Sequence, residues 1–396
     1  MSERHKTPAI EAHGRPGQPL GMPPAQFLRR YWQKHPLLVR GAFPGFEPPL
    51  SGDDLAGLAC EEIALSRLVQ HDRARDAWQT RTGPFTEADF AGLPARDWTL
   101  LVQDCDKLIG EVEELLRPFT FLPDWRIDDV MVSYAAPGGS VGAHVDQYDV
   151  FLLQGHGRRR WRISTDPAAP LAFREDVELK LLARFDPTHD WVLEPGDLLY
   201  LPPRVPHFGE AVGECTTWSI GLRAPAVGEI LVDFAEQLAE RLGEDRRYAD
   251  PDLTPAVEAA EIDAAAIARV RTLLREAATL DDGAIAALFA RFITRYRSAQ
   301  QPAPPPRAID AGALLAALDR GKALYRSPWS RYAWQREARG ARLWFAGDGH
   351  LGTLRIARKL QDHRRLDAAT LGKVSPSEAS LLATLHNAGH LVIDDA

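Results

Sequence analysis

The chain has 396 residues, of which 45% are hydrophobic and 26% charged, and this composition excludes a wholly disordered or fibrous protein. At roughly 100–200 residues per domain, this length predicts two or three domains. The formal charge of -8 argues against attraction to nucleic acid over the whole surface. The charge is uneven, because residues 301–396 hold 14 basic and 9 acidic residues, a net of +5, which leaves -13 for residues 1–300.

The three cysteines, Cys60, Cys105 and Cys215, predict neither a disulfide framework nor a zinc site, because their number is odd and their spacing fits no ligand motif. The first twenty residues contain no apolar signal segment, and no stretch approaches the ~18 apolar residues of a membrane helix. We therefore expect a cytoplasmic protein that does not associate with a membrane.

The first predicted elements are a helix over residues 25–32 and a buried strand over 37–39. An apolar stripe of Phe27, Leu28, Tyr31 and Trp32 predicts the helix, and Pro36 ends it, since the residue before a proline avoids helical geometry. A second helix is predicted over 105–117, where apolar residues again recur at helical spacing.

Between about residues 125 and 225 the pattern changes to short β-runs separated by Gly and Pro. Such strands, with little helical pattern between them, predict a β-sandwich or barrel rather than alternating strands and helices. The predicted strands cover residues 129–134, 150–154, 160–163, 191–193, 198–201 and 216–222.

Helical spacing returns over residues 227–299 and predicts a small helical bundle. The run Gln301-Pro302-Ala303-Pro304-Pro305-Pro306 predicts a linker, because consecutive prolines favour extended conformation. Beyond it, helices near 308–321 and 376–387 with strands at 342–345 and 391–393 predict a small α+β unit.

Three residues in the β-rich segment form a candidate metal site. His144-Val145-Asp146 places an imidazole and a carboxylate two positions apart, so in an extended strand both would point to one face. After a Pro-Gly turn and an apolar strand, His207 supplies a third ligand. Two histidines and one carboxylate on one face of an octahedral iron leave three positions for a 2-oxo acid and dioxygen. The alternative is that both histidines are merely structural.

Arg159 is the candidate partner for the far carboxylate of such a cosubstrate, because a guanidinium fork binds a carboxylate through two hydrogen bonds. Alternation on a strand puts Arg159, Trp161 and Ile163 on one face and leaves the neighbouring arginines on the other. A solvated arginine run is the competing interpretation. Ser133 is the candidate hydroxyl beside the same carboxylate, and Ser219 is a weaker candidate.

The chain resembles the JmjC-type ribosomal oxygenases. The resemblance lies in four stretches, residues 32–36, 122–129, 137–161 and 195–225, and the run from His144 to Trp161 is its most specific part. It implies a double-stranded β-helix of the JmjC or cupin type in which Fe(II) is bound by His144, Asp146 and His207, and 2-oxoglutarate by Arg159 and Ser133.

The resemblance further implies a JmjC catalytic domain over residues 1–226, a helical homodimerisation domain over 227–300 and a winged-helix-like domain over 307–396. The implied activity is hydroxylation of a ribosomal protein, with carbon 3 of an arginine of large-subunit protein sixteen as the first expectation. Alternatives are histidine hydroxylation of another ribosomal protein, lysine demethylation, and a nucleic-acid-binding regulator with a cupin sensor. Aromatic residues of the basic tail could contact nucleic acid, although core packing is their preferred explanation.

Overall fold

A computed structural model describes residues 8–242, 245–255, 258, 260–296 and 300–393. The chain divides into two compact units, Met1–Ala224 and Pro225–Ala396. Parts of the predicted domains, namely residues 1–7, 243–244, 256–257, 259, 297–299 and 394–396, lie outside the described residues. None of the described helices is both long and apolar enough to cross a membrane.

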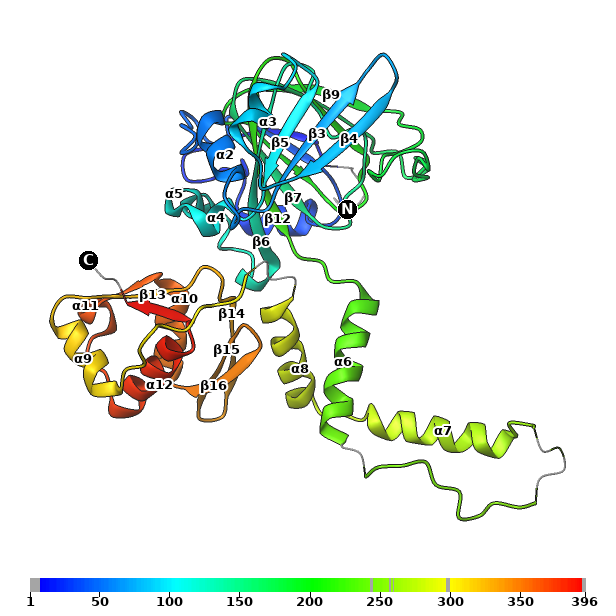
Figure 1. Ribbon diagram of the computed structural model, residues 1–396, viewed down its shortest axis with the longest axis vertical. Helices are drawn as coiled ribbons and strands as arrows, with labels where there is room; N and C mark the ends of the chain where they lie inside the picture. The colour runs from blue at the N-terminus through cyan, green and yellow to red at the C-terminus, as the bar shows by residue number, and fades with distance from the viewer. Residues whose placement is uncertain (1–7, 243–244, 256–257, 259, 297–299, 394–396) are drawn as a thin grey trace, which may run out of the picture. The chain divides into compact units, whose positions relative to one another are not determined.

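The first unit is built from two sheets (Figure 1). A nine-stranded sheet has the order β1-β2-β10-β7-β12-β6-β5-β3-β4, and a three-stranded sheet has the order β11-β8-β9. The large sheet contains β1 (Glu11–His13), β2 (Leu37–Arg40), β3 (Ser66–Asp72), β4 (Ala77–Thr82), β5 (Trp98–Val102), β6 (Ile127–Ala135), β7 (Val150–His156), β10 (Leu198–Leu201) and β12 (Cys215–Leu222). The small sheet contains β8 (Arg159–Ile163), β9 (His189–Leu193) and β11 (His207–Ala211). From β6 to β12 the chain passes twice from the large sheet to the small one and back, and the predicted double-stranded β-helix is confirmed.

The two faces of the large sheet have different roles, because successive side chains of a strand point to opposite faces. On β6, Val130 and Val132 join a buried apolar core with Phe27 of helix α1 (Pro24–Arg30) and Leu55 of α2 (Gly52–Ala59). The opposite face of the large sheet carries Ser133 and faces the small sheet. The space between the two sheets is therefore where polar side chains of the site can meet.

The single helix predicted over residues 105–117 is wrong. The segment forms α4 (Cys105–Leu108), α5 (Gly110–Glu113) and a 3₁₀ helix at Glu114–Phe119, followed by another 3₁₀ turn at Asp124–Arg126; α3 (Glu87–Ala91) precedes them. Ile109 breaks the helix with extended backbone angles, φ -130° and ψ 117°. Val112 is nevertheless fully buried, and Leu108, Leu115 and Leu116 pack partly buried against the core, so the apolar spacing predicted the buried side of the segment but not its continuity.

The second unit contains the predicted helices and more strands than predicted. Its helices are α6 (Val227–Leu242), α7 (Ala264–Ala277), α8 (Asp282–Arg295), α9 (Ala311–Asp319), α10 (Leu354–Asp362), α11 (Ala368–Leu371) and α12 (Pro376–Asn387). Its strands are β13 (Leu324–Arg326), β14 (Tyr332–Glu337), β15 (Gly340–Phe345), β16 (Asp348–Gly352), β17 (Arg365–Leu366) and β18 (Leu391–Ile393). Because α8 contacts α6 as well as β14 and β15, the proline-rich linker lies inside this unit, and the three-domain division stays a prediction.

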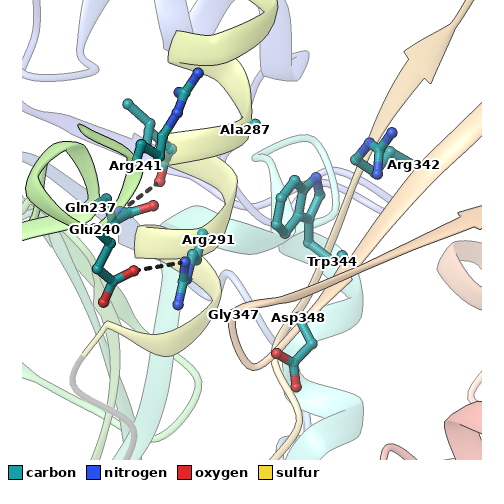
Figure 2. Close-up of a pocket in the computed structure, with 11 residues that line it drawn as sticks. Gln237, Glu240, Arg241, Ala287, Arg291, Arg342, Trp344, Gly347 and Asp348 are labelled. Atoms are coloured by element: carbon teal, nitrogen blue, oxygen red, sulfur yellow. Dashed lines mark hydrogen bonds and ion pairs between the residues drawn. The ribbon is translucent and has the colours of Figure 1, made fainter. Parts of the chain in front are cut away.

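Aromatic side chains of the tail pack within the second unit. Tyr332 and Trp344 are buried, and the indole of Trp334 donates a hydrogen bond to Gln361. This packing agrees with the structural explanation that the sequence favoured. Beside Trp344, a cavity of about 420 Å³ is bordered by α6, α8 and the β15–β16 turn, and Glu240 and Arg291 form an ion pair at its edge (Figure 2).

Candidate metal and cosubstrate site

His144, Asp146 and His207 lie together, as the sequence predicted. One ligand atom from each residue lies within 4.8 Å of the other two, and these three form the one such group of histidine, cysteine and acidic side chains among the described residues. The two imidazole centroids are 4.2 Å apart, and Nε2 of His207 is 3.6 Å from a carboxylate oxygen of Asp146. Two imidazoles and a carboxylate at this separation form the donor set that suits iron.

Backbone hydrogen bonds bring the two histidines side by side. The amide of each donates to the carbonyl of the other at 3.0 Å, which joins the segment around His144 to the first residue of β11. The expectation that His144 and Asp146 share a continuous strand is wrong, because only His144 forms a bridge and residues 145–149 follow an irregular path. The carbonyl of Asp146 accepts a hydrogen bond from the amide of Arg204 at 2.7 Å, which holds that path in place.

The ring orientation of both histidines is fixed by carbonyl groups. Nδ1 of His144 donates to the carbonyl of Gly142 at 2.9 Å, and Nδ1 of His207 donates to that of Val205 at 2.8 Å. A carbonyl can only accept, so each Nδ1 carries the proton and each Nε2 keeps its lone pair. Burial, together with the neighbouring His144, lowers the pKa of His207 to about 4, which keeps its imidazole neutral and able to bind a metal.

Arg159 lies between the sheets as a buried cation. The predicted alternation along β8 is confirmed, since Arg159, Trp161 and Ile163 are buried while Arg160 is exposed. The guanidinium contacts Ser133 Oγ at 3.4 Å, Thr217 Oγ1 at 3.3 Å and the carbonyl of Gly209 at 3.4 Å. Its Nε is buried without a partner, and among the described residues no carboxylate pairs with it. Burial lowers the pKa of Arg159. An arginine stays protonated in proteins, so the site contains an uncompensated positive charge.

Ser133 lies where the sequence placed it, and Thr217 is a neighbour that the sequence analysis missed. The two residues are paired across β6 and β12, and both are buried. Strand alternation applied to β12 would have indicated Thr217, because it shares a face with Ser219. Ser219 is also buried, but among the described contacts none joins it to Arg159.

Asp129 is a second charged group that the sequence analysis did not single out. It shares a face of β6 with Ser133, four residues further along the strand. Burial, then the neighbouring Asp128 carboxylate, raises the pKa of Asp129 to about 7. Burial, followed by the carboxylates of Asp146 and Asp129, raises the pKa of Tyr148. The inter-sheet space therefore carries a cation at one end and a carboxylate at the other.

Comparisons with known proteins agree with this geometry. A model of the JmjC domain matches residues 114–230, and a model of the ROXA-like winged helix matches residues 276–392. A model of an AraC-like ligand binding domain matches residues 184–318, across the boundary between the two units.

The chain is similar to ribosomal protein uL16 3-hydroxylase of Escherichia coli (strain K12), with 38% identity over 303 residues that cover 76% of this chain and 79% of that protein. A probable ribosomal oxygenase of Haemophilus influenzae is 38% identical over 58% of this chain and 55% of its own length.

Solved structures agree over nearly the whole chain. The X-ray structure of E. coli YcfD has 34% sequence identity and a TM-score of 0.84, and covers 95% of this chain and 99% of that one. A structure of the same ribosomal oxygenase in complex with cobalt and 2-oxoglutarate gives a TM-score of 0.81 at the same identity and coverage. The chain therefore belongs to the JmjC-domain ribosomal oxygenase family.

Proposed function

We propose that this chain hydroxylates carbon 3 of an arginine in ribosomal protein uL16, as an Fe(II)- and 2-oxoglutarate-dependent oxygenase of the cytoplasm. The observation that carries the proposal is the convergence of His144, Asp146 and His207 beside an unpaired buried arginine, in a chain 38% identical to a uL16 3-hydroxylase. Hydroxylation of a histidine in another ribosomal protein is the alternative within the same chemistry.

The proposed iron ligands are Nε2 of His144, Nε2 of His207 and the carboxylate of Asp146. Their fit is supported by the carbonyl groups that hold each Nδ1 proton, since such partners fix the tautomer in which Nε2 faces the metal. When bound, iron supplies oxidation of an unactivated C–H bond by dioxygen, coupled to decarboxylation of 2-oxoglutarate to succinate.

Arg159, Ser133 and Thr217 are the proposed partners of the far carboxylate of 2-oxoglutarate. A five-carbon diacid fits the distance, because Arg159 reaches the carbonyl of Gly209, two residues or about 6–7 Å of strand from His207. The carboxylate would satisfy the buried Nε of Arg159 and compensate its charge. The surrounding side chains bind and orient the cosubstrate and exclude water from it.

A cationic substrate side chain suits the other end of the site. Asp129 accepts a hydrogen bond from the amide of Asp104 at 3.2 Å but forms no salt bridge with a described residue, and its raised pKa reflects the cost of leaving a carboxylate poorly solvated. A guanidinium bound there would stabilise the charged form and orient the carbon to be oxidised. This supports an arginine over a neutral histidine.

The experiment that tests this function combines purified chain, Fe(II), 2-oxoglutarate and a uL16 fragment, followed by mass spectrometry of the product and measurement of succinate. The proposal predicts a product heavier by one oxygen at an arginine, with stoichiometric succinate. Hydroxylation of a histidine in a different ribosomal protein would replace the substrate assignment, and failure to form succinate with any ribosomal protein would contradict the enzymatic activity.

A homodimer is part of the proposal, supported by apolar side chains that the second unit leaves exposed. On α6, Val227, Leu231 and Val232 are 72%, 63% and 61% exposed, and on α7 Leu274 is 65% exposed. Both helices therefore carry large apolar side chains that the described chain leaves exposed, and exposed apolar patches are typical of interaction surfaces. A second copy of the chain is the proposed partner, and binding of nucleic acid by the basic tail stays an open prediction.

A further inference from the structure

Asp149, three residues after Asp146, is a fully buried carboxylate with three side-chain donors. It accepts hydrogen bonds from the hydroxyl of Tyr200 at 2.6 Å, Nε2 of Gln33 at 2.9 Å and a guanidinium nitrogen of Arg126 at 3.2 Å. Its exposure is 0%. A carboxylate held by two neutral donors and a cation is strongly fixed, since charge-assisted hydrogen bonds are about twice as strong as neutral ones.

The three donors come from distant parts of the first unit and brace one another. Gln33 follows α1, Arg126 precedes β6 and Tyr200 lies on β10. The amide of Gln33 also donates to the hydroxyl of Tyr200 at 2.9 Å. Trp32 stacks on Tyr200 with ring centroids 5.9 Å apart, and the Arg126 guanidinium lies 5.3 Å from the Trp32 ring. We call Gln33, Arg126 and Tyr200 the Asp149 clamp.

The metal-ligand segment has few other supports. On one side of Asp146, the bridge between His144 and His207 ties the chain to β11. At Asp146 itself, the amide of Arg204 donates a hydrogen bond to the backbone carbonyl. The side chain of Asp146 is 22% exposed, and the hydroxyl of Tyr148 hydrogen-bonds to its carboxylate. Asp149 is the next point along the chain at which that backbone is firmly attached.

We propose that Asp149 is a positioning residue for the metal site, and that the Asp149 clamp holds the Asp146 carboxylate within reach of the two imidazoles. The inference rests on the proposed metal-binding role of His144, Asp146 and His207. Gln33, which lies outside the β-helix, then contributes to iron binding through its hydrogen bond to Asp149.

A purely structural role for Asp149 is the competing explanation, and Asp197 provides a matched comparison. Asp197 is also buried, with 6% exposure, and accepts hydrogen bonds from Arg40 at 2.7 Å and from the amides of Gly41 at 2.8 Å and Glu194 at 3.1 Å. Asp197 immediately precedes the first residue of β10, whereas Tyr200 lies near the last residue of that strand. Loss of either carboxylate should destabilise the fold, but loss of Asp149 alone should disturb the metal ligands.

The test is titration of the full chain with Co(II), followed by its visible absorption spectrum, for the wild type, Asp149→Asn and Asp197→Asn, together with thermal unfolding of each. We expect Asp149→Asn to weaken Co(II) binding at least about tenfold and to change the spectrum, as loss of groups that orient metal ligands does. Asp197→Asn should stay within about twofold of the wild type even where its unfolding temperature falls equally.

Tyr200→Phe and Gln33→Leu, which each leave Asp149 two donors, provide milder variants and should weaken Co(II) binding in the same direction. Equal Co(II) affinity of Asp149→Asn and wild type, or equal weakening by Asp149→Asn and Asp197→Asn, would overturn the positioning role while leaving the proposed function intact. A wild-type chain that binds no Co(II) would overturn both.

Discussion

At the scale of single residues, the sequence located the site because its chemistry needs particular side chains at particular spacing. His144, Asp146 and His207 could be predicted from ligand type and order, and Arg159 from strand alternation. Thr217 and Asp129 were missed: strand alternation on β12 would have indicated Thr217, whereas Asp129 is one of many acidic residues without a distinguishing pattern. Their significance comes from the register of β6 with β12 and from burial, which are properties of the folded chain.

Replacement of Arg159 tests the cosubstrate end of the site. Arg159→Ala should raise the KM for 2-oxoglutarate by about 100-fold, because removal of one partner from a buried charged pair costs about 2–5 kcal/mol. This KM is measured from the rate of succinate formation at varied 2-oxoglutarate concentration. Arg160→Ala is the control and should change KM by less than about twofold, since Arg160 forms an exposed ion pair with Asp190. Equal KM values for the two variants would contradict the assignment of Arg159.

The pH dependence of kcat/KM tests the role of Asp129 at the substrate end of the site. Its pKa is raised to about 7, with Asp128, Lys107, Asp104 and Asp106 as the charged groups around it. Its carboxylate gains its charge as pH rises through that value, so kcat/KM for an arginine substrate should increase with pH across this range. Asp129→Asn should lower kcat/KM and flatten the profile, while 2-oxoglutarate turnover without substrate keeps the wild-type pH dependence. An unchanged profile in Asp129→Asn would show that another group titrates.

At the scale of elements, local patterns predicted which segments are buried better than how they are folded. Residues 105–117 have helical apolar spacing, yet the segment breaks at Ile109, because its apolar side chains pack against the sheet from a bent path. The segment around Asp146 alternates like a strand but forms only one bridge, at His144. Strands β3, β4 and β5 were not predicted, although β3 and β4 pair as a local hairpin; only the pairing of β5 with β3 and β6 joins segments distant in sequence.

Strand β11 lies against the cosubstrate site at Gly209, and this close packing allows a test at the scale of a single element. A Cβ at Gly209 would lie 2.7 Å from the Trp161 ring and 2.9 Å from Nε of Arg159. Gly209→Ala should therefore displace Arg159, raise the KM for 2-oxoglutarate at least about tenfold and cost about 1–3 kcal/mol of folding free energy. Gly213→Ala, where a Cβ meets nothing within 4 Å, should leave both unchanged. A wild-type KM in Gly209→Ala would contradict this packing.

At the scale of the whole molecule, the predicted division into domains over residues 1–226, 227–300 and 307–396 stays a prediction. The proline run predicted a boundary that the second unit spans, because α8 packs on β14 and β15 on the far side of it. Association of two chains was expected only through the resemblance. The exposed apolar residues on α6 and α7 could not be identified from sequence, since apolar spacing alone does not say which chain covers a helix.

The homodimer can be tested at α7. Leu274→Glu should convert a dimer to a monomer in light scattering, because a charge would have to be buried in the apolar contact. Arg275→Gln, at the next residue along the same helix, changes the charge by the same one unit and should leave the dimer intact. A wild-type chain that is monomeric at micromolar concentration would contradict the proposed dimer.

The central claim, that three side chains hold one iron, is tested most directly by an anomalous difference map from crystals of the chain loaded with Fe(II) under anaerobic conditions. The account predicts one strong peak about 2.0–2.2 Å from Nε2 of His144, Nε2 of His207 and a carboxylate oxygen of Asp146, with the far carboxylate of added 2-oxoglutarate on Arg159. A peak elsewhere, or none at these three residues, would contradict it.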